Sequence, residues 1–366
     1  MTRDGIWRAG IIGTGAIAEY HARAIESQPG ARLVGVVDRS REGAEQFAAR
    51  WGDPAVHDTL ERLLDAESLD VLHVCTPPGV HAEQTVAALE AGVHVIVEKP
   101  PALALDQLDI MQRAADRAGK ALAVVFQQRT GTGAAHVRAL LESGVLGRPL
   151  VATCHTLWYR DADYFAVPWR GRWESEGGGP TLGHGIHQLD LLAWLLGDWE
   201  SVRGQLWRVD RETQTEDVSS AVVTFANGVV ASVFTSAVSP RQTSSIRIDT
   251  ERATITVDHL YGHRHENWRI TPAPHVSDAE AAEWSLPVEE EPSGHDPLIR
   301  DVYAALRSGT ELPSTASDPA RSLEIVTAIY ASATSGETVT PQTLRQASAH
   351  RASLESPVVD RRPTRD

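Results

Sequence analysis

The stretch Arg8–Asp38, RAGIIGTGAIAEYHARAIESQPGARLVGVVD, predicts a strand, a tight turn, a helix and a second strand. An apolar run of strand length, Ile6 to Ile12, precedes the spacing G-x-G-x-x-A formed by Gly13, Gly15 and Ala18. The first glycine allows the sharp turn, the second lets a pyrophosphate approach the backbone, and the small third residue lets the helix pack on the strand. We therefore expect a dinucleotide to bind with its phosphates at the N-terminus of this helix.

An acidic residue, Asp38, ends the second strand of this unit. Its carboxylate can accept hydrogen bonds from the ribose hydroxyls and would repel a 2′-phosphate, so we expect NAD as the cofactor. Arg39 and Arg41 follow closely and could pair with such a phosphate, which keeps NADP open. A glycine-rich turn alone also occurs in structural loops, but here the whole strand–turn–helix–strand–acid pattern is present.

The bulk composition excludes several classes of protein. The 366 residues are enough for two domains of ordinary size. The net charge of −15 argues against nucleic acid as a partner, because a nucleic-acid-binding face needs an excess of lysine and arginine. No apolar run approaches the roughly 18 residues of a membrane span. Only two cysteines occur and no secretory signal is visible, so we expect a cytoplasmic protein without disulfides.

The order of apolar and helical patterns predicts two domains. Strands alternate with helices through the first third of the chain, so residues 1–128 are expected to form a Rossmann domain with a parallel sheet. Several alternating runs between Val202 and Ile270 predict an α+β domain at 129–342 with a largely antiparallel, open-faced sheet. Residues 343–366 contain few large apolar side chains, so we expect a disordered tail.

Polar residues follow three predicted strands, where ligands of parallel sheets bind. These groups are Thr76-Pro77-Pro78, Glu98-Lys99-Pro100 and Gln127-Gln128-Arg129. Lys99 is the most informative, because a charged residue at the end of a buried strand needs a partner or a function. The alternative interpretations are a solvated strand end and an ion pair with Glu98.

A second group of chemically active residues lies in the stretch 177–190, GGGPTLGHGIHQLD. His187 and Asp190 are three residues apart on a predicted amphipathic helix, 185–196, and so lie on one side of it. His187 can act as a general acid or base near neutral pH, or it can be a hydrogen-bonded core histidine. His184, His187 and Asp190 could also be metal ligands, but no fourth ligand has a convincing spacing, so we expect no metal.

Together these motifs resemble the glucose-fructose oxidoreductase / inositol dehydrogenase (Gfo/Idh/MocA) family over about residues 6 to 342. The segments that carry the resemblance are GIIGTGAIA, CTPPGVHAEQTVAALEAGVHVIVEKPPAL, GGGPTLGHGIHQLDLLAWLLGD, TEDVSSAVVTFANGVV and IVTAIYASATSGETV. The resemblance implies oxidation of a sugar or polyol hydroxyl by hydride transfer to nicotinamide. Lys99 would stabilise the reacting oxygen and His187 would take its proton. It also implies a homodimer or homotetramer formed through the open face of the second sheet.

The motifs and the resemblance together give the expected site. The expected cofactor-binding residues are Gly13, Gly15, Ala16, Ile17, Asp38, Arg39, Thr76, Pro77, His81, Glu98, Lys99 and Gln127. The expected catalytic residues are Lys99, His187 and His184. The family often has an aspartate four residues before the catalytic histidine, where this chain has Gly183. We expect His184, or substrate and water, to carry the proton instead.

The loop 158–173 is where we expect substrate identity to be decided. Aromatic faces suit the C–H surfaces of a sugar, and arginines suit hydroxyls or an anionic group. The expected substrate-binding residues are Tyr159, Arg160, Trp169, Arg170, Arg172, His184 and His187. An interface or a packed core is the alternative interpretation of this loop. The arginines favour an anionic or heavily hydroxylated pyranoside.

Three functions fit the sequence. The first is an NAD(P)-dependent dehydrogenase acting on a sugar, a sugar derivative or a polyol. The second is an NAD-dependent glycosidase that oxidises C3, eliminates the aglycone and reduces C3 again. The third is a non-catalytic, cofactor-binding regulator, against which Lys99 and His187 argue. A dehydrogenase accumulates NADH, whereas the glycosidase releases aglycone without net NADH.

Overall fold

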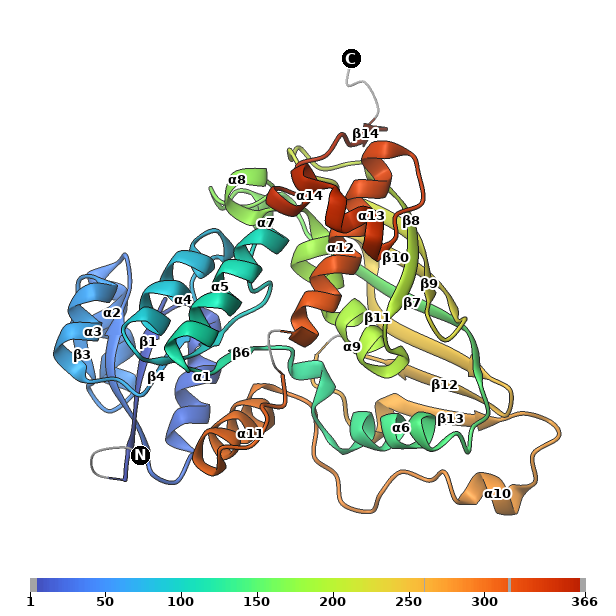
Figure 1. Cartoon of the computed structure of the whole chain (residues 1–366), viewed down its shortest axis with the longest axis horizontal. Helices are drawn as coiled ribbons and strands as arrows, with labels where there is room; N and C mark the ends of the chain where they lie inside the picture. The colour runs from blue at the N-terminus through green and yellow to red at the C-terminus, as the bar shows by residue number, and fades with distance from the viewer. Residues whose placement is uncertain (1–4, 260, 315–316, 363–366) are drawn as a thin grey trace. The chain divides into compact units, whose positions relative to one another are not determined.

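The computed structural model describes residues 5–259, 261–314 and 317–362 (Figure 1). The chain divides into two compact units, and neither is continuous in sequence. The first unit comprises Met1–Ala102, Asp106–Phe126 and His295–Pro319. The second unit comprises Leu103–Leu105, Gln127–Gly294 and Ala320–Asp366.

The first unit is built on a six-stranded sheet in the order β3-β2-β1-β4-β5-β6, with every strand pair parallel. Its strands are β1 (Trp7–Ile12), β2 (Ala31–Val37), β3 (Ala55–His57), β4 (Val71–Val74), β5 (His94–Val97) and β6 (Leu122–Val124). Its helical elements are α1 (Ala16–Glu26), α2 (Arg41–Arg50), α3 (Leu60–Glu67), the turn η1 (Pro78–Val80), α4 (His81–Glu90), α5 (Leu105–Ala118) and α11 (His295–Ser308). All residues of β4 are buried, as expected for a strand covered on both faces.

Two apolar clusters stabilise this unit. One packs α1 and α2 against the sheet, with Ile11, Ala22 and Phe47 at 0% exposure. In the other, the late helix α11 packs Leu298, Ile299, Val302 and Tyr303 with residues of β4, β5 and β6. Helix α11 therefore completes the core of the first unit, although most of the second unit precedes it in the sequence.

The second unit contains an eight-stranded sheet in the order β13-β12-β11-β7-β10-β9-β8-β14. Its strands are β7 (Pro149–Tyr159), β8 (Trp199–Arg208), β9 (Val218–Phe225), β10 (Val230–Ser236), β11 (Val238–Thr250), β12 (Ala253–Asp258), β13 (Trp268–Pro272) and β14 (Val359–Asp360). The pairs β7–β10 and β8–β14 are parallel and the others are antiparallel. The predicted fold class, a Rossmann domain followed by a largely antiparallel sheet domain, is confirmed.

Helices cover one face of this second sheet. The helical elements of the unit are η2 (Gln127–Arg129), α6 (Thr132–Ser143), α7 (Ala162–Phe165), α8 (Trp173–Glu176), η3 (Thr181–Gly185), α9 (Ile186–Leu196), η4 (His265–Asn267), α10 (Asp278–Ala282), α12 (Ser317–Ser335), α13 (Pro341–Gln346) and α14 (Ser348–Ala352). Helix α12 touches β8 closely, because the Ser332 hydroxyl accepts from the Gly204 N–H at 3.0 Å. The sequence predicted an amphipathic helix at 185–196, but α9 is buried on nearly every side.

The other face of the sheet carries exposed apolar side chains. Burial alternates along β10 from Val230 to Thr235, with Ala231 and Val233 inward and Val230 and Phe234 outward. Val230 lies opposite Val151 of β7, and these two side chains are 46% and 49% exposed. The period of two therefore produces one packed face and one open face, as the sequence predicted.

The end of the chain differs from the expectation of disorder. Residues 343–362 contain part of α13, the helix α14 and the strand β14, which pairs with β8 through Val359 and Trp207. Two buried leucines, Leu344 and Leu354, and backbone pairing to a sheet edge hold this otherwise polar segment, and composition does not report this. The final residues, 363–366, lie outside the described residues. Within the described chain, each helix is too short or too polar to cross a membrane.

Candidate functional site

The glycine-rich turn has the geometry that a pyrophosphate needs. Gly13 has φ +87°, and an added Cβ there would lie 2.8 Å from the backbone of Cys75 at the end of β4. At Gly15, the N-cap of α1, an added Cβ would meet nothing within 4 Å, and no side chain caps the helix. The N–H groups of the first turn, which begins with Ala16 and Ile17, thus face open space next to a helix N-terminus. These residues fit a bound dinucleotide.

Asp38 ties the end of β2 to this turn. Its Oδ2 accepts from the backbone N–H and the hydroxyl of Thr14 at 2.7 and 3.0 Å, and its Oδ1 accepts from the Ser40 N–H at 2.8 Å. The carboxylate is half-buried, so it can also meet ribose hydroxyls, while Arg39 is exposed. Arg41 pairs with Glu45 and Asp58 at 2.9 and 2.5 Å. Arg41, one of the two arginines that could pair with the 2′-phosphate of NADP, is therefore already paired with carboxylates.

His81 links the loops that follow β4 and β5. Its Nε2 lies 2.7 Å from the Thr76 carbonyl and its Nδ1 lies 2.9 Å from the Pro100 carbonyl. The ring is 1% exposed, and burial lowers its pKa. Thr76 also donates from its hydroxyl to Gln84 at 2.6 Å. His81 therefore fixes the two strand ends through their backbones, with Pro77 in the loop that it holds.

Glu98 is the centre of a buried hydrogen-bond network in the first unit. Its Oε1 lies 3.1 Å from His21 Nε2 and 3.0 Å from His295 Nε2, and its Oε2 accepts from the Lys99 backbone N–H at 3.1 Å. Burial alone would raise the pKa of Glu98, but the hydrogen bonds from His21 and His295 outweigh it and hold the pKa well below its ordinary value. Glu98 is therefore an ionised carboxylate that anchors the peptide of Lys99.

The network continues away from Lys99. His21 Nδ1 lies 2.8 Å from His73 Nδ1, and His73 Nε2 lies 3.1 Å from the Tyr303 hydroxyl. In one consistent arrangement, Tyr303 donates to His73, His73 donates to His21, and His21 donates to Glu98. The ring nitrogens of both histidines then each have a hydrogen-bond partner. Burial lowers the pKa of both imidazoles, so both are neutral in this arrangement.

One set of side chains could hold a metal ion. The ligand atoms of His21, Glu98 and His295 all lie within 4.8 Å of one another. Their N···O separations of 3.0 and 3.1 Å are ordinary hydrogen-bond lengths, so hydrogen bonding alone accounts for the cluster. The set considered from sequence, His184, His187 and Asp190, is less suitable, because Asp190 is engaged by Arg129 and Ser322.

In the second unit, both candidate histidines lie where a π-helical turn meets α9. His184 belongs to η3 and is 9% exposed, and His187 lies in the first turn of α9 and is 1% exposed. The His184 Nε2 lies 3.1 Å from the Tyr164 hydroxyl and 3.4 Å from Arg160 Nε, and its ring lies 4.7 Å from that of Trp158. His184 is thus joined to the arginine-rich loop.

Two buried acids, Asp190 and Glu216, hold this segment in place. Asp190 accepts from Arg129 Nε and from the Ser322 hydroxyl, both at 2.6 Å. Glu216 accepts from the backbone N–H groups of Gly179 and Thr181 at 3.1 Å each. The sequence analysis missed Glu216, whose partners are 35 and 37 residues away. The available signals were its place in the segment TEDVSSAVVTFANGVV and its position two residues before Val218, which begins β9.

The loop 158–173 is tightly self-associated. Two guanidinium groups lie over the Tyr164 ring, that of Arg170 at 3.7 Å and that of Arg160 at 5.2 Å from its centroid. Arg170 also lies 4.3 Å from the Trp169 ring and 3.4 Å from Glu176. Burial raises the pKa of the Tyr164 hydroxyl. These arginines are therefore held in place by aromatic rings.

The remaining expected site residues fall in both units. Tyr159 is exposed beneath the Arg211 guanidinium, which lies 5.1 Å from its ring, and Arg172 is exposed as well. Gln127 begins η2 and is 5% exposed. Gln127 thus belongs to the second unit, whereas the other expected cofactor-binding residues belong to the first.

Comparisons with known proteins agree with this architecture. A family model described as "Oxidoreductase family, NAD-binding Rossmann fold" matches residues 7–126, and the "GFO/IDH/MocA C-terminal domain" matches residues 134–256. The D-glucoside 3-dehydrogenase of Escherichia coli is 37% identical over 194 residues, which are 52% of this chain and 54% of that protein. The chain thus spans about half the length of that relative.

Two further relatives match along most of their length. The D-apiose dehydrogenase of Paraburkholderia graminis is 27% identical over 348 residues, 91% of this chain and 89% of that protein. The WlbA dehydrogenase of Bordetella pertussis, solved in complex with NADH and UDP-GlcNAcA, superposes with a TM-score of 0.83 at 28% identity. That match covers 93% of this chain and 99% of the solved chain. The expectation of NAD as cofactor is confirmed.

The two family models together extend over most of the chain, and the open glycine turn and the two sheets are those expected of such a protein. The chain belongs to the Gfo/Idh/MocA family of NAD-binding oxidoreductases.

Proposed function

We propose that this chain oxidises a secondary hydroxyl of a sugar, a sugar derivative or a polyol to a ketone. One observation carries the proposal: the peptide of Lys99 is anchored at the end of β5 by the ionised carboxylate of Glu98. Such an anchor fits a side chain that must be aimed, in the same unit as the open glycine turn.

Each catalytic residue has a defined task in this proposal. The Lys99 ammonium donates a hydrogen bond to the hydroxyl oxygen and stabilises the negative charge that develops on it. His187 accepts the hydroxyl proton, and His184 assists in the place of the aspartate that Gly183 replaces. Bound NAD supplies the hydride acceptor. The glycine turn and Asp38 hold the cofactor by its phosphates and ribose.

The relatives support a substrate class. One of them is named for oxidation of glucosides at carbon 3, and another acts on the sugar apiose. The aromatic and arginine side chains of the loop 158–173 suit a pyranoside, and we propose the C3 hydroxyl of a glycoside as the reacting group.

The glycosidase alternative rests on His184. It is a second buried imidazole, three residues before His187, and it contacts the Tyr164 hydroxyl. A second proton carrier is what elimination after C3 oxidation requires. Measuring NADH and free aglycone together on aryl glycosides separates the two reactions, since only the dehydrogenase accumulates NADH.

Lys99→Met tests the proposal. The variant should keep its affinity for NAD and lose turnover by at least about 100-fold, because the donor to the developing alkoxide is gone. Isothermal titration with NAD and steady-state rates with a panel of glycosides measure the two effects. Lys120→Met, at a half-buried lysine after α5, is the matched control. Normal turnover by Lys99→Met would remove Lys99 from the mechanism.

A further inference from the structure

A polar pocket of about 460 Å³ lies within the second unit, apart from the proposed catalytic residues. Its volume falls within the usual range for small-molecule sites. Its lining residues are Trp173, Glu174, Arg208, Gln214, Ser353 and Glu355. They come from α8, the end of β8, the β8–β9 loop and the segment after α14. The pocket includes neither Lys99 nor the two candidate histidines.

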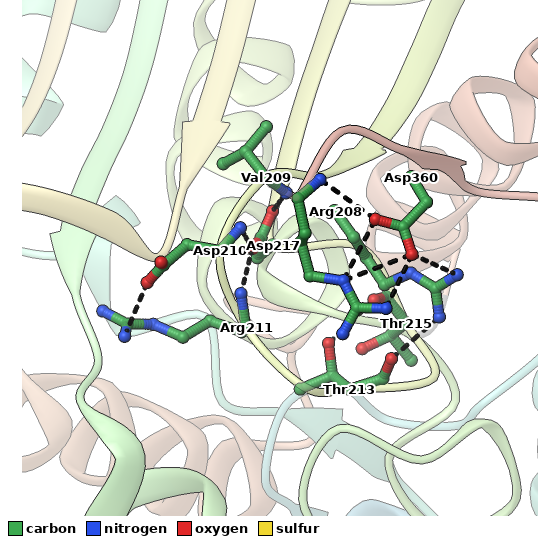
Figure 2. A network of polar contacts seen from close by, with 9 residues as sticks. Arg208, Val209, Asp210, Arg211, Thr213, Thr215, Asp217 and Asp360 are labelled. Carbon is green, nitrogen blue, oxygen red and sulfur yellow. Dashed lines mark hydrogen bonds and ion pairs between the residues drawn. The ribbon is translucent and has the colours of Figure 1, made fainter. Parts of the chain in front are cut away.

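The β8–β9 loop that forms one wall is held by a single buried carboxylate (Figure 2). Asp217, at 0% exposure, accepts from the backbone N–H groups of Val209, Asp210 and Arg211 at 2.8, 2.8 and 2.7 Å. Three N–H donors on one carboxylate fix the turn directly after Arg208.

Hydrogen bonds join the same loop to α8 and to the residues just before it. The Gln214 backbone N–H donates to the Gly171 carbonyl at 2.8 Å, and the Trp173 backbone N–H donates to Gln214 Oε1 at 3.3 Å. Arg208 Nη1 donates to the Thr213 carbonyl at 2.9 Å. The Arg208 guanidinium and the Gln214 amide are therefore each held by a backbone group before any ligand binds.

The C-terminal segment closes the third side. β14 runs parallel to β8, with Asp360 opposite Arg208, and the Arg361 N–H donates to the Arg208 carbonyl at 2.8 Å. The side chains of Arg208 and Asp360 also form an ion pair, with 3.5 Å between Arg208 Nη2 and Asp360 Oδ2 (Figure 2). This pairing fixes Val359 and Asp360 beside β8, a few residues after the lining residues Ser353 and Glu355.

The lining has the chemistry of a carbohydrate site. Trp173 is half-buried, and its ring stands nearly perpendicular to that of Tyr330 at 5.9 Å, so the indole is fixed as an apolar surface for sugar C–H groups. Arg208 supplies donors, Glu174 and Glu355 supply acceptors, and Gln214 and Ser353 supply both. Vicinal hydroxyls, each a donor and an acceptor, match such a mixture. The carboxylates of Glu174 and Glu355 outnumber the Arg208 guanidinium, so the lining would repel a sugar ring that carries a negative charge.

We infer that this pocket binds a neutral pyranose ring. The inference concerns a ring-binding site on the second unit, and it stands whether or not Lys99 and His187 are catalytic. In a glycoside substrate with more than one sugar, such a pocket would hold a ring that does not react.

Nuclear magnetic resonance of the full chain tests the inference. The indole N–H of Trp173, identified by its loss in Trp173→Phe, is followed while methyl β-D-glucopyranoside is added without NAD. We expect a saturable shift with a dissociation constant in the millimolar range, roughly 1 mM or weaker. D-Glucuronate should bind about threefold more weakly, because its carboxylate meets Glu174 and Glu355.

Variants assign the shift to this pocket. The double variant Glu174→Gln, Glu355→Gln should weaken binding of the methyl glucoside by about threefold or more. Glu200→Gln, at an exposed glutamate of β8, is the matched control and should bind as the wild type does. Lys99→Met should show the same titration as the wild type.

Three results would overturn the inference. They are an indole signal that does not move, tighter binding of glucuronate than of the glucoside, and loss of the shift in Lys99→Met. The last result would assign the sugar to the catalytic site. Failure of the proposed function would instead appear as absence of turnover, with the Trp173 titration intact.

Discussion

Arg129 and Asp190 form a buried ion pair in which two guanidinium nitrogens meet the two carboxylate oxygens. Arg129 Nε donates to Asp190 Oδ2 at 2.6 Å and Nη2 donates to Oδ1, while the Ser322 hydroxyl donates to the same carboxylate at 2.6 Å. The two charged side chains are 4% and 1% exposed. The pair ties the turn η2 to the middle of α9, the helix that begins with the segment carrying His187.

Asp190→Ala should destabilise the chain by about 3–5 kcal/mol, because it leaves the Arg129 guanidinium buried without its counter-charge. Urea unfolding followed by circular dichroism measures the loss. Glu142→Ala, which breaks the exposed pair with Arg138, should cost less than about 1 kcal/mol and is the control. A similar loss of unfolding free energy in the two variants would show that burial does not determine how much an ion pair contributes to stability.

Glu98→Gln should reduce turnover by about tenfold or more without a large change in NAD affinity. The amide keeps the shape of the side chain but has one acceptor oxygen instead of two. It cannot accept both from the two histidines and from the Lys99 N–H, so the anchor of this peptide is weakened. Steady-state rates and NAD titration separate the two effects. Glu90→Gln, at the exposed end of α4, is the control. A folded Glu98→Gln variant with normal turnover would show that the network serves stability alone.

His263 should make the chain more stable at neutral than at acidic pH. Burial, together with the charge of His259, lowers the pKa of His263 from 6.5 to about 4. Between these values the unfolded chain binds more protons than the folded chain, so stability falls as the pH decreases from 6.5 towards 4. This one group should account for about 2 kcal/mol between about pH 7 and about pH 5.

His263→Gln should flatten that dependence by the same amount, whatever its effect on stability at neutral pH. Chemical unfolding at the two pH values gives the difference, and His275→Gln, at an exposed histidine, is the control. An unchanged slope in His263→Gln would assign the acid sensitivity to other histidines.

The open face of the second sheet is the surface through which we propose that the chain pairs with another copy of itself. Val151, Val222 and Val230 are 46 to 50% exposed there, and Phe234 is 37% exposed. The double variant Val230→Lys, Phe234→Lys should shift the chain towards the monomer, because each lysine would have to be desolvated at the interface. Sedimentation velocity measures the change. Ile110→Lys, at a residue of α5 that is 47% exposed, is the control, and a monomeric wild type would refute the proposal.

The elements that the sequence predicted best are those with a local pattern. The strand, the helix and the second strand predicted within Arg8–Asp38 appear as β1, α1 and β2. Period and turn residues suffice for such elements, because neighbouring residues carry the signal. The glycine turn was predictable for the same reason.

The features that the sequence did not reveal depend on residues far apart in the chain. Arg129 and Asp190 are 61 residues apart, and Tyr303 and His73 are 230 apart. Nothing in the spacing of one sequence joins such pairs. The burial of α9 on nearly every side was missed because its few polar residues, such as His187 and Asp190, made it look amphipathic. Both are buried, and Asp190 is hydrogen-bonded by Arg129 and Ser322.

Helix α11 has a consequence for how the protein is made. Leu298, Ile299 and Val302 pack against Val71 and Ile96, so the nucleotide-binding half lacks part of its interior until this helix exists. During synthesis on the ribosome, the first unit therefore remains incompletely buried until most of the second unit has been made. A gene fragment that stops near residue 128 therefore encodes an incomplete nucleotide-binding unit. A chimera that exchanges this unit between relatives must include α11 as well.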